Sequence, residues 1–420
     1  MLMDTDCIVI KPSELNGELY ITGAKNAVLR HLAACILTDG KIRITNYPKN
    51  MLDVRVQEDM LVYLGKKIFK DNNSVVIEDS VSTSELIWEK RSIRNTLLIL
   101  GALLTKTGYG KVPLPGGCPL GDRKYDIHIG LMNAMGAKVW QDGEYLCAKV
   151  DGKLHGCEYS LPIRSTGATE NSIIMGVLAQ GESKIWNPHI RPEILDLIAL
   201  LNKMGAHIVV NGQESIVIEG VESLEGDVSH HALSDNMQAL TYLMAGAIAG
   251  KELLIHNFPF QDLEVPLLFL KFSGLKYYQY NTDVIVRRCA PYPIDISTGP
   301  YPGINSDMQP LFAVWGALAK GVSNITDLRF IGRYGYSEEF KNLGVDCGVD
   351  NNKLTIRGGK TILGNKKVSA IDLRAGAALL LLGLVAEAPI MIENFWMVER
   401  GYDDVLSTLR QLGVDYEIEG

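Results

Sequence analysis

Hydrophobic and polar positions follow one recurring order along the 420-residue chain. A run with helical periodicity ends in a hydrophobic residue followed by glycine, and a run that alternates as in a β-strand comes next. The glycines at these junctions are Gly65, Gly136, Gly205, Gly274, Gly344 and Gly413. They lie 69 to 71 residues apart. A fixed period of this kind indicates structural repeats, so the pattern predicts six repeats of about 70 residues.

Each predicted repeat also contains a second helix, rich in small and apolar residues, such as residues 374–386 (RAGAALLLLGLVA). A helix that is apolar nearly all round is buried on every side. Residues 53–65 (DVRVQEDMLVYLG) instead predict an amphipathic helix with one face towards solvent. Alternating runs such as residues 41–45 (KIRIT) predict half-buried strands. The order of strands and helices predicts an α/β fold.

Six repeats can be arranged as one solenoid or as two globular groups of three. Buried helices need neighbours on several sides, which favours two groups of three, each around a common centre. We therefore expect two domains of three repeats each. The first is predicted to comprise residues 1–24 and 233–420, and the second residues 25–232.

The composition is that of an ordinary globular protein, with 47% hydrophobic and 21% charged residues. A formal net charge of −8 argues against general affinity for nucleic acid or anionic membranes, but it is compatible with an anionic small substrate. The longest apolar run, Ala375 to Ala386, is too short to span a bilayer. We therefore expect a protein that acts on small molecules, as a monomer or weak homo-oligomer.

The N-terminal residues and the cysteines bear on cellular location. The first ten residues, MLMDTDCIVI, carry two aspartates and no basic segment, so no signal peptide is expected. Seven cysteines occur without a Cys-x-x-Cys pair, so neither a zinc site nor a disulfide framework is expected. Both features favour the reducing cytoplasm.

Residues with potential chemistry gather where the predicted buried helices begin. They are Lys25, Arg94, Gly167, Asp307 and Arg374. Helix N-termini bind anions through their free N–H groups and the helix dipole. If the two groups of repeats face each other through these ends, the cleft between them is an anion-binding site.

A cysteine with features of a reactive thiol lies in the glycine-rich stretch PLPGGCPLGDRKYDIH, residues 113–128. Arg123 and Lys124 follow Cys118 closely, and nearby cations lower the pKa of a thiol and favour the thiolate. Taken alone, such a motif is more often a loop cysteine without a role.

Two helix starts carry candidate ligands for phosphate groups. In TGAKNA, Lys25 and Asn26 begin a buried helix, where the lysine either binds a phosphate or stays solvated. This motif is not a P-loop. In STGATEN, Ser165, Thr166 and Gly167 either cradle a diphosphate or simply cap the helix.

Three further residues are candidates for acid–base or anion-binding roles. Asp307 in NSDMQP is a helix cap unless it faces a cleft and reaches a substrate hydroxyl. Arg374 in DLRAGAAL lies against a predicted buried helix, and ERGYDD offers Arg400. An arginine beside so apolar a helix needs a partner, and its guanidinium suits a carboxylate or a phosphate.

Together these motifs resemble the enolpyruvyl transferase family, the superfamily of EPSP synthase. The motifs are GAKNA at 23–27, GGCPLGDR at 116–123, STGATEN at 165–171, SDMQ at 306–309, DLRAGAAL at 372–379 and RGY at 400–402. Their order and spacing fit the family over essentially the full length. The resemblance implies an inside-out α/β barrel of two domains, each with three βαβαββ-like repeats, and no metal or organic cofactor.

The resemblance also implies roles for residues at matching positions. Lys25, Arg123 and Arg400 would hold the phosphate of phosphoenolpyruvate, with Arg374 in the same anion site. Cys118 would close over phosphoenolpyruvate, act as a general acid, assist product release and be the thiol alkylated by fosfomycin. The implied catalytic residues are Cys118, Asp307, Lys25 and Arg400.

The implied acceptor is a uridine nucleotide, with UDP-N-acetylglucosamine as the expected one. Asp307 would accept the proton of its 3-hydroxyl as that oxygen attacks C2 of phosphoenolpyruvate, and Asn26 would contact the sugar. Protonation of C3 and loss of phosphate would then give the enol ether, the first committed step of peptidoglycan synthesis. The implied nucleotide-binding residues are Asn26, Arg94, Arg123, Lys124, Tyr125, Asp126, Ile127, Ser165, Thr166, Gly167, Asp307 and Arg329.

The sequence departs from the family in segments that bind the acceptor. The family has Arg-Pro-Val-Asp-Leu-His after the cysteine loop, where this chain has Arg-Lys-Tyr-Asp-Ile-His at 123–128. Residues 234–238 read Ser-Asp-Asn-Met-Gln instead of Pro-Asp-Arg-Ile-Glu, and residues 331–336 keep Arg333 alone of Glu-Asn-Arg-Phe-Met-His. Two alternatives therefore stay open: a paralogue that uses another uridine nucleotide, such as UMP, and a non-catalytic nucleotide-binding homologue.

Overall fold

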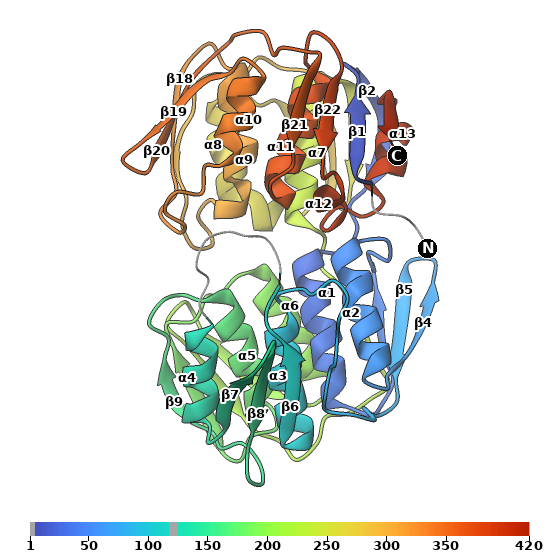
Figure 1. Cartoon of the computed structure of the whole chain (residues 1–420), viewed down its shortest axis with the longest axis vertical. Coiled ribbons are helices and arrows are strands. Elements are labelled where there is room, and N and C mark those ends of the chain that lie inside the picture. Colours follow the sequence, from blue (N-terminus) through green and yellow to red (C-terminus); the bar gives the residue numbers. More distant parts are fainter. Residues whose placement is uncertain (1–4, 117–124, 420) are drawn as a thin grey trace. The chain divides into compact units, whose positions relative to one another are not determined.

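The computed structural model describes residues 5–116 and 125–419 (Figure 1). The chain forms two compact units, which divide after Thr22 and after Leu233. Within the described residues, unit 1 comprises 5–22 and 234–419, and unit 2 comprises 23–116 and 125–233. Each unit has its own hydrophobic core. Helices and strands are interspersed along both units, as predicted for an α/β fold.

The described part of unit 2 contains three sheets. The first has the strand order β13 (Val228–His231), β3 (Ile42–Thr45), β5 (Ser74–Glu78) and β4 (Lys67–Asp71). The second has the order β6 (Tyr109–Pro113), β8 (Tyr145–Lys149) and β7 (Lys138–Asp142). The third has the order β11 (His207–Asn211), β12 (Ser215–Glu219), β10 (Glu182–Trp186) and β9 (Glu158–Ser160). Its helices are α1 (Lys25–Ala34), η1 (Cys35–Leu37), α2 (Leu52–Tyr63), α3 (Thr96–Thr107), α4 (Asp126–Ala134), α5 (Thr166–Gly176) and α6 (Pro192–Lys203).

The described part of unit 1 also contains three sheets. The first has the strand order β15 (Tyr277–Tyr280), β16 (Asp283–Val286), β14 (Gly250–His256) and β2 (Leu15–Tyr20). The second has the order β17 (Asp295–Ser297), β18 (Gly321–Thr326), β20 (Lys353–Gly358) and β19 (Asp346–Asp350). The third has the order β21 (Lys366–Ser369), β22 (Ile390–Glu393), β1 (Cys7–Ile10) and β23 (Tyr416–Glu419). Its helices are α7 (Asn236–Ala249), η2 (Phe260–Leu263), α8 (Glu264–Phe272), η3 (Ser306–Met308), α9 (Gln309–Leu318), α10 (Tyr336–Asn342), α11 (Leu373–Leu384), α12 (Trp396–Glu399) and α13 (Val405–Gln411).

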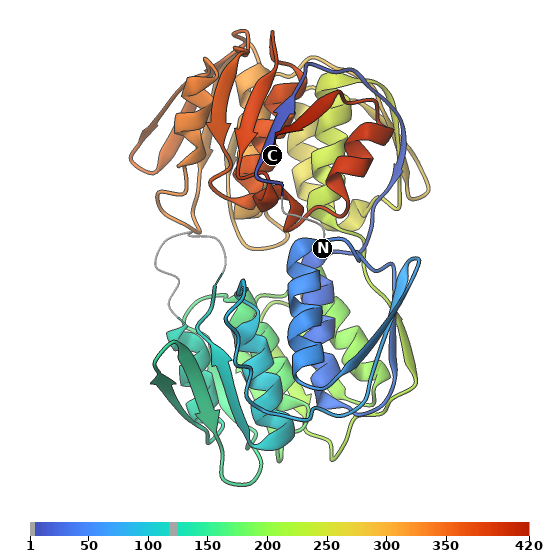
Figure 2. The same ribbon diagram turned by 45° about the vertical axis from the view of Figure 1, so that its right-hand side comes forward.

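The four-stranded sheets share one construction. In each of them a parallel pair of strands continues into antiparallel neighbours, as where β2 runs parallel to β14 and β14 runs antiparallel to β16. The sheet formed by the last strands of the chain also contains the first strand. In it, β1 lies between β22 and β23 (Figure 2). Ile8 is paired there with Ile392 on one side and Ile418 on the other. The first and the last strand of the chain are therefore neighbours in one sheet of unit 1.

The six junction glycines have a common conformation that explains their recurrence. Each follows an amphipathic helix directly and has a positive φ, between 83° and 107°. L-residues with a Cβ rarely adopt this conformation, whereas glycine does so without strain. The chain needs it at these points because the helix must stop and turn into the next strand.

The core of each unit is built around helices that are buried on all sides. In unit 1, α7, α9 and α11 contact one another, and every residue of α11 is buried, as the small-residue pattern predicts. In unit 2, α3 packs against both α1 and α5. The approach of α3 and α5 requires a glycine, because a Cβ on Gly101 would lie 1.9 Å from Oδ1 of Asn171. Among the helices of residues 5–116 and 125–419, none is long and apolar enough to cross a membrane.

Candidate active site

The buried helices of unit 1 begin with polar side chains that cap them. Asp235 accepts hydrogen bonds from two backbone N–H groups at the start of α7, and Asp372 does the same at α11. At η3, which runs into α9, Asn305 accepts the N–H of Asp307 at 3.0 Å. Because Asn305 supplies this cap, the carboxylate of Asp307 is available for other contacts.

The carboxylate of Asp307 lies between two arginines of unit 1. Its Oδ1 is 2.7 Å from Nη1 of Arg333, and its Oδ2 is 4.0 Å from Nε of Arg374. The arginine side chains are 7% and 5% exposed, whereas that of Asp307 is 31% exposed. Asp307 is therefore the member of this cluster that solvent, or a substrate hydroxyl, can reach.

Both arginines keep donor groups that no protein acceptor satisfies. Within the described residues, the buried Nη1 of Arg374 and Nε of Arg333 make no hydrogen bond. Burial by itself would lower the pKa of Arg374, but Tyr402 and Asp307 outweigh burial and raise it. The guanidinium also lies over the Tyr402 ring, 5.6 Å from its centroid. Buried charged donors without acceptors are what an anion such as a phosphate or carboxylate would satisfy.

A buried aspartate organises the loop that carries Arg333. Asp327 is 0% exposed and accepts hydrogen bonds from Thr298, Ser306 and Gln309, as well as from the backbone N–H groups of Arg329 and Phe330. The Ser306 hydroxyl in turn accepts Nη1 of Arg333 at 3.0 Å. This network fixes the loop from 327 to 333 against η3, which places Arg333 beside Asp307.

The two other arginines predicted in unit 1 differ in their surroundings. Arg400 follows α12 and is buried, with Nη1 3.9 Å from the sulfur of Met397. Arg329 is exposed, and its guanidinium lies over the Phe330 ring, 5.6 Å from the centroid. Only one of the two, Arg400, shares the burial of Arg374 and Arg333.

In unit 2, the lysine at the start of α1 is paired rather than solvated. Nζ of Lys25 lies 3.2 Å from Oδ2 of Asp53, which is near the start of α2. The two side chains are 12% and 5% exposed. An anion that binds Lys25 must therefore compete with, or add to, this carboxylate.

A second buried ion pair lies one turn along the same helix. Nε of Arg30 donates to Oε1 of Glu170 on α5 at 2.6 Å, and Nη1 of Arg30 donates to Oδ1 of Asn26 at 3.5 Å. Burial raises the pKa of Glu170, although the Arg30 charge opposes that shift. Arg30 therefore connects Asn26 on α1 with Glu170 on α5.

The start of α5 is capped by its own side chains. Oγ of Ser165 accepts the N–H of Ala168 at 3.4 Å, so the N-cap interpretation of this serine is correct. The Thr166 hydroxyl lies 2.8 Å from Nδ1 of His189. A Cβ on Gly167 would lie 3.1 Å from Nε2 of His128, so a larger residue would fit there only if the His128 ring moved slightly.

His128 is a buried, uncharged neighbour of this helix start. Burial, together with the charge of Arg94, lowers the pKa of His128 to about 4. Its Nδ1 lies 3.1 Å from Nδ2 of Asn171, whose amide donates. Arg94 precedes the N-cap of α3, and burial also lowers the pKa of its guanidinium.

Part of the predicted site lies in the cysteine loop. Cys118, Arg123 and Lys124 fall outside the described residues. The structure resumes at Tyr125, which is half-buried and precedes α4, where Asp126 and Ile127 form the first turn. Asp126 is exposed at that helix start.

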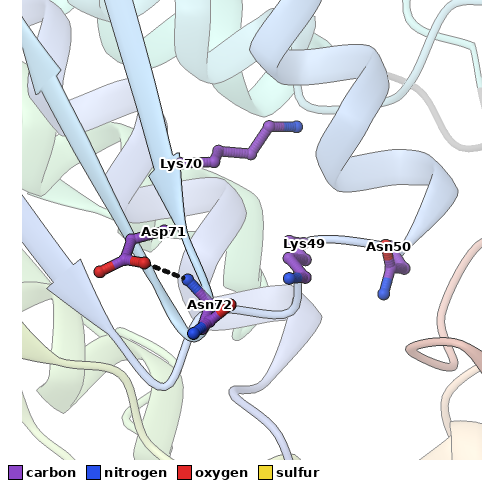
Figure 3. A pocket seen from close by; sticks show the side chains of 5 residues that line it. All are labelled: Lys49, Asn50, Lys70, Asp71 and Asn72. Carbon is purple, nitrogen blue, oxygen red and sulfur yellow. Dashed lines mark hydrogen bonds between the residues drawn. The ribbon is translucent and has the colours of Figure 1, made fainter.

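Two surface cavities lie away from these residues. One, of about 390 Å³, is lined by Lys49, Asn50, Lys70, Asp71 and Asn72 in unit 2 (Figure 3). The other, of about 500 Å³, lies in unit 1 at the C-terminal ends of α7, α9 and α11. Neither is lined by a predicted site residue.

Several residues that contact the predicted ones were not among the sequence candidates, and they include Asp53, Arg30 and Arg333. Each is placed by contacts between segments far apart in sequence, such as 26 residues between Asp307 and Arg333. The retained Arg333 in an otherwise altered segment was the one available signal.

The chain is similar to known proteins along nearly its whole length. The sequence pattern of EPSP synthase (3-phosphoshikimate 1-carboxyvinyltransferase) matches residues 9–409. A UDP-N-acetylglucosamine 1-carboxyvinyltransferase of Rickettsia felis is 37% identical over 411 residues, which cover 96% of each chain. The protein of the same name from Rickettsia canadensis is 36% identical over 415 residues, covering 97% of this chain and 98% of that one.

Solved structures show the same fold at lower identity. The enolpyruvyl transferase NikO from Streptomyces tendae superimposes with a TM-score of 0.88 at 22% identity, covering 98% of this chain and 99% of that one. An EPSP synthase from Acinetobacter baumannii superimposes with a TM-score of 0.75 at 16% identity, covering 99% and 100%.

Proposed function

This chain belongs to the EPSP synthase family, and we propose that it transfers the enolpyruvyl group of phosphoenolpyruvate to the 3-hydroxyl of UDP-N-acetylglucosamine. The relatives that support this acceptor carry the name of that reaction and match 96% or more of the chain at 36–37% identity. Phosphate is the second product. The reaction would begin peptidoglycan synthesis, in the cytoplasm where such nucleotide precursors are used, by a monomer or weak homo-oligomer.

The observation that carries the proposal is the Asp307 cluster of unit 1. Asp307 is partly exposed and lies beside Arg333 and Arg374, whose remaining buried donors have no protein acceptor within the described chain. A carboxylate in reach of solvent can accept the proton of the sugar hydroxyl as that oxygen attacks C2 of phosphoenolpyruvate. The neighbouring arginines stabilise the negative charge of phosphoenolpyruvate and of the ketal intermediate.

The later steps of the reaction are protonation of C3 and elimination of phosphate, and further residues are proposed to take part in them. Protonation of C3, for which Cys118 is the proposed acid, completes the addition. Proton loss at C3 and departure of phosphate then give the enol ether. Lys25, Arg123 and Arg400 are proposed to bind the phosphate with Arg374, and exclusion of water protects the intermediate.

For the acceptor we propose the residues of unit 2 that surround the starts of α1, α3, α4 and α5. Asn26, held by Arg30, is proposed to contact the sugar. Arg94, Thr166 and Gly167 are proposed to bind the nucleotide, together with Arg123, Lys124, Tyr125, Asp126, Ile127, Ser165 and, from unit 1, Arg329. The fold is proposed to be an inside-out α/β barrel of six repeats, in two domains of residues 1–24 with 233–420 and residues 25–232.

The test is phosphate release from phosphoenolpyruvate by the purified full chain in the presence of each acceptor. We expect release with UDP-N-acetylglucosamine and not with shikimate 3-phosphate. Release with UMP alone would instead identify a paralogue of different acceptor specificity. Nucleotide binding without phosphate release from any acceptor would identify a non-catalytic homologue.

Fosfomycin gives an independent test of the proposed thiol. We expect one covalent adduct per chain at Cys118, seen as a single mass increment and located by peptide mapping. An unchanged intact mass, with and without phosphoenolpyruvate, would contradict the role proposed for this cysteine.

A further inference from the structure

Two histidines and an aspartate converge in unit 2, and none of the three has been given a role above. They are His31 on α1, Asp196 on α6 and His230 on β13. Nε2 of His230 lies 2.8 Å from Oδ1 of Asp196, and Nε2 of His31 lies 3.1 Å from Oδ2. The potential ligand atoms of all three residues lie within 4.8 Å of one another. Segments up to about 200 residues apart in sequence thus bring three metal-ligand types to one point.

The burial of His31 makes this cluster unusual. Its side chain is 0% exposed, and neither of its ring nitrogens makes a well-aligned hydrogen bond with any of residues 5–116 and 125–419. Nε2 is near the Asp196 carboxylate but is not aligned with it as a hydrogen bond requires. Buried polar atoms in folded proteins nearly always have a partner, so an unaligned buried imidazole beside a carboxylate indicates a shared third species.

We propose that His31, Asp196 and His230 bind one divalent transition-metal ion, with Zn²⁺ as the best match. Imidazole nitrogen and carboxylate oxygen are ordinary Zn²⁺ ligands, and both histidines are ligands that Mg²⁺ and Ca²⁺ do not favour. Ligand atoms about 2.0–2.1 Å from one ion lie roughly 3 Å apart at the angles of such sites, close to the two spacings observed. Three protein ligands leave a further position for water.

One neighbouring charge opposes the ion and offers a means to test the site. Nζ of Lys203 lies 3.4 Å from Nδ1 of His230 and 3.3 Å from the Ser229 carbonyl oxygen. A neutral histidine that binds a metal through Nε2 carries its proton on Nδ1. The Lys203 ammonium group cannot accept a hydrogen bond from that N–H, because it has donors only. Lys203 is exposed, so its side chain can turn away, but its positive charge still repels the ion.

The role of the ion would be to join three elements of unit 2. It would tie α1, which begins at Lys25, to α6 and β13. Oδ2 of Asp196 also accepts the N–H of Leu233 at 3.3 Å, the last residue of unit 2. A ligand that binds the folded state alone raises the melting temperature, so Zn²⁺ is expected to stabilise the protein without taking part in the transfer reaction.

The experiment titrates Zn²⁺ into metal-free full-length protein by calorimetry, with Co²⁺ absorption as a spectroscopic probe of nitrogen and oxygen ligation. Four proteins are compared: the parent, His230→Gln, His231→Gln and Lys203→Met. His231 is the matched control, because it is the adjacent residue, is exposed, and contacts Thr45 rather than the cluster. Binding by cysteine thiols is common to all four and cancels in the comparison.

We expect one Zn²⁺ per chain in the parent that raises the melting temperature. His230→Gln should weaken it by at least about 100-fold, His231→Gln should leave it unchanged, and Lys203→Met should tighten it by about threefold at physiological salt. Equal binding by His230→Gln and His231→Gln would overturn the proposal and identify the cluster as a metal-free hydrogen-bonded link. If His230→Gln does not fold, unchanged or weaker Zn²⁺ binding by Lys203→Met would overturn it.

Discussion

The two units differ in how the N-termini of their buried helices are capped. In unit 1, Asp235, Asn305 and Asp372 cap the helical segments with their side chains. In unit 2, α5 is capped by Ser165, but no side chain of the described residues caps α1 or α3. Unit 1 therefore presents arginine side chains as its free donors, whereas unit 2 leaves backbone N–H groups at two helix starts to interact with a ligand.

The charged side chains follow the same division. In unit 1, the arginines around Asp307 keep unsatisfied donors, so an anion adds to the cluster without displacing a group. In unit 2, Lys25 and Arg30 are already paired with Asp53 and Glu170. We infer that unit 1 is preorganised for the reacting anion and that unit 2 rearranges its ion pairs when substrates bind.

The largest expected effect is at Asp307. Asp307→Asn removes the proposed base while keeping a similar shape, so kcat for phosphate release should fall by about 10³-fold. The matched control, Asp350→Asn, alters an exposed aspartate of unit 1 at the end of β19 and should leave kcat unchanged. A fall of less than tenfold in Asp307→Asn would place the base elsewhere.

The next effect tests the paired lysine of unit 2. Lys25→Met removes one charged donor and should raise the KM for phosphoenolpyruvate by about 100-fold. Lys49→Met, in the surface cavity of Figure 3, removes a lysine of the same unit and should change neither KM nor kcat. Equal effects of the two substitutions would show that Lys25 contributes general positive charge rather than a specific contact.

The uncharged state of His128 predicts how stability depends on pH. Burial lowers the pKa of His128 to about 4, below the usual value of 6.5, so the unfolded chain binds a proton more readily than the folded one. The stability of the fold is therefore not reduced by this histidine above about pH 6.5, and it decreases as the pH falls from 6.5 towards 4. Between pH 7.5 and 5 the loss should be about 2 kcal/mol, measured by urea unfolding. His128→Gln should lack this part of the pH dependence, and an unaltered pH dependence would contradict a buried neutral histidine.

The smallest effect concerns the side-chain cap that Ser165 provides for α5 in unit 2. Ser165→Ala removes the hydrogen bond to the N–H of Ala168 and should lower the free energy of unfolding by about 1 kcal/mol. Ser160→Ala, at the exposed end of β9, is the control and should have little effect. If nucleotide binding also weakens in Ser165→Ala, the serine serves both functions that the sequence left open.

The local features of the fold could be predicted from the sequence because they depend on short-range chemistry. The six junction glycines follow from the need for a positive φ after a helix, and the small-residue run at 373–384 follows from burial on all sides. Family membership was likewise predictable from the six motifs and is confirmed. These signals are all contained in continuous stretches of sequence.

The contacts of the site could not be predicted from the sequence. Several side chains could cap the same helix or pair with the same charge, and only the folded structure shows which of them does so. Asp307 was predicted to be either a helix cap or a reactive carboxylate, and the structure shows that Asn305 caps the helix, while the reactive role of Asp307 stays a prediction. Lys25 was expected to be solvated or phosphate-bound, and its ion pair with Asp53 arises from the packing of α1 on α2. The cysteine pattern predicted no zinc site, and it carries no information on the site proposed at two histidines about 200 residues apart.

Enolpyruvyl transfer with Asp307 as the base is tested most directly by measuring phosphate release. The full chain is supplied with phosphoenolpyruvate and UDP-N-acetylglucosamine, and the parent is compared with Asp307→Asn. If Asp307 is the base, we expect acceptor-dependent phosphate release by the parent and about 10³-fold slower release by the variant, with both proteins folded and binding nucleotide. No release from the parent with this acceptor, or equal rates in the two proteins, would contradict it.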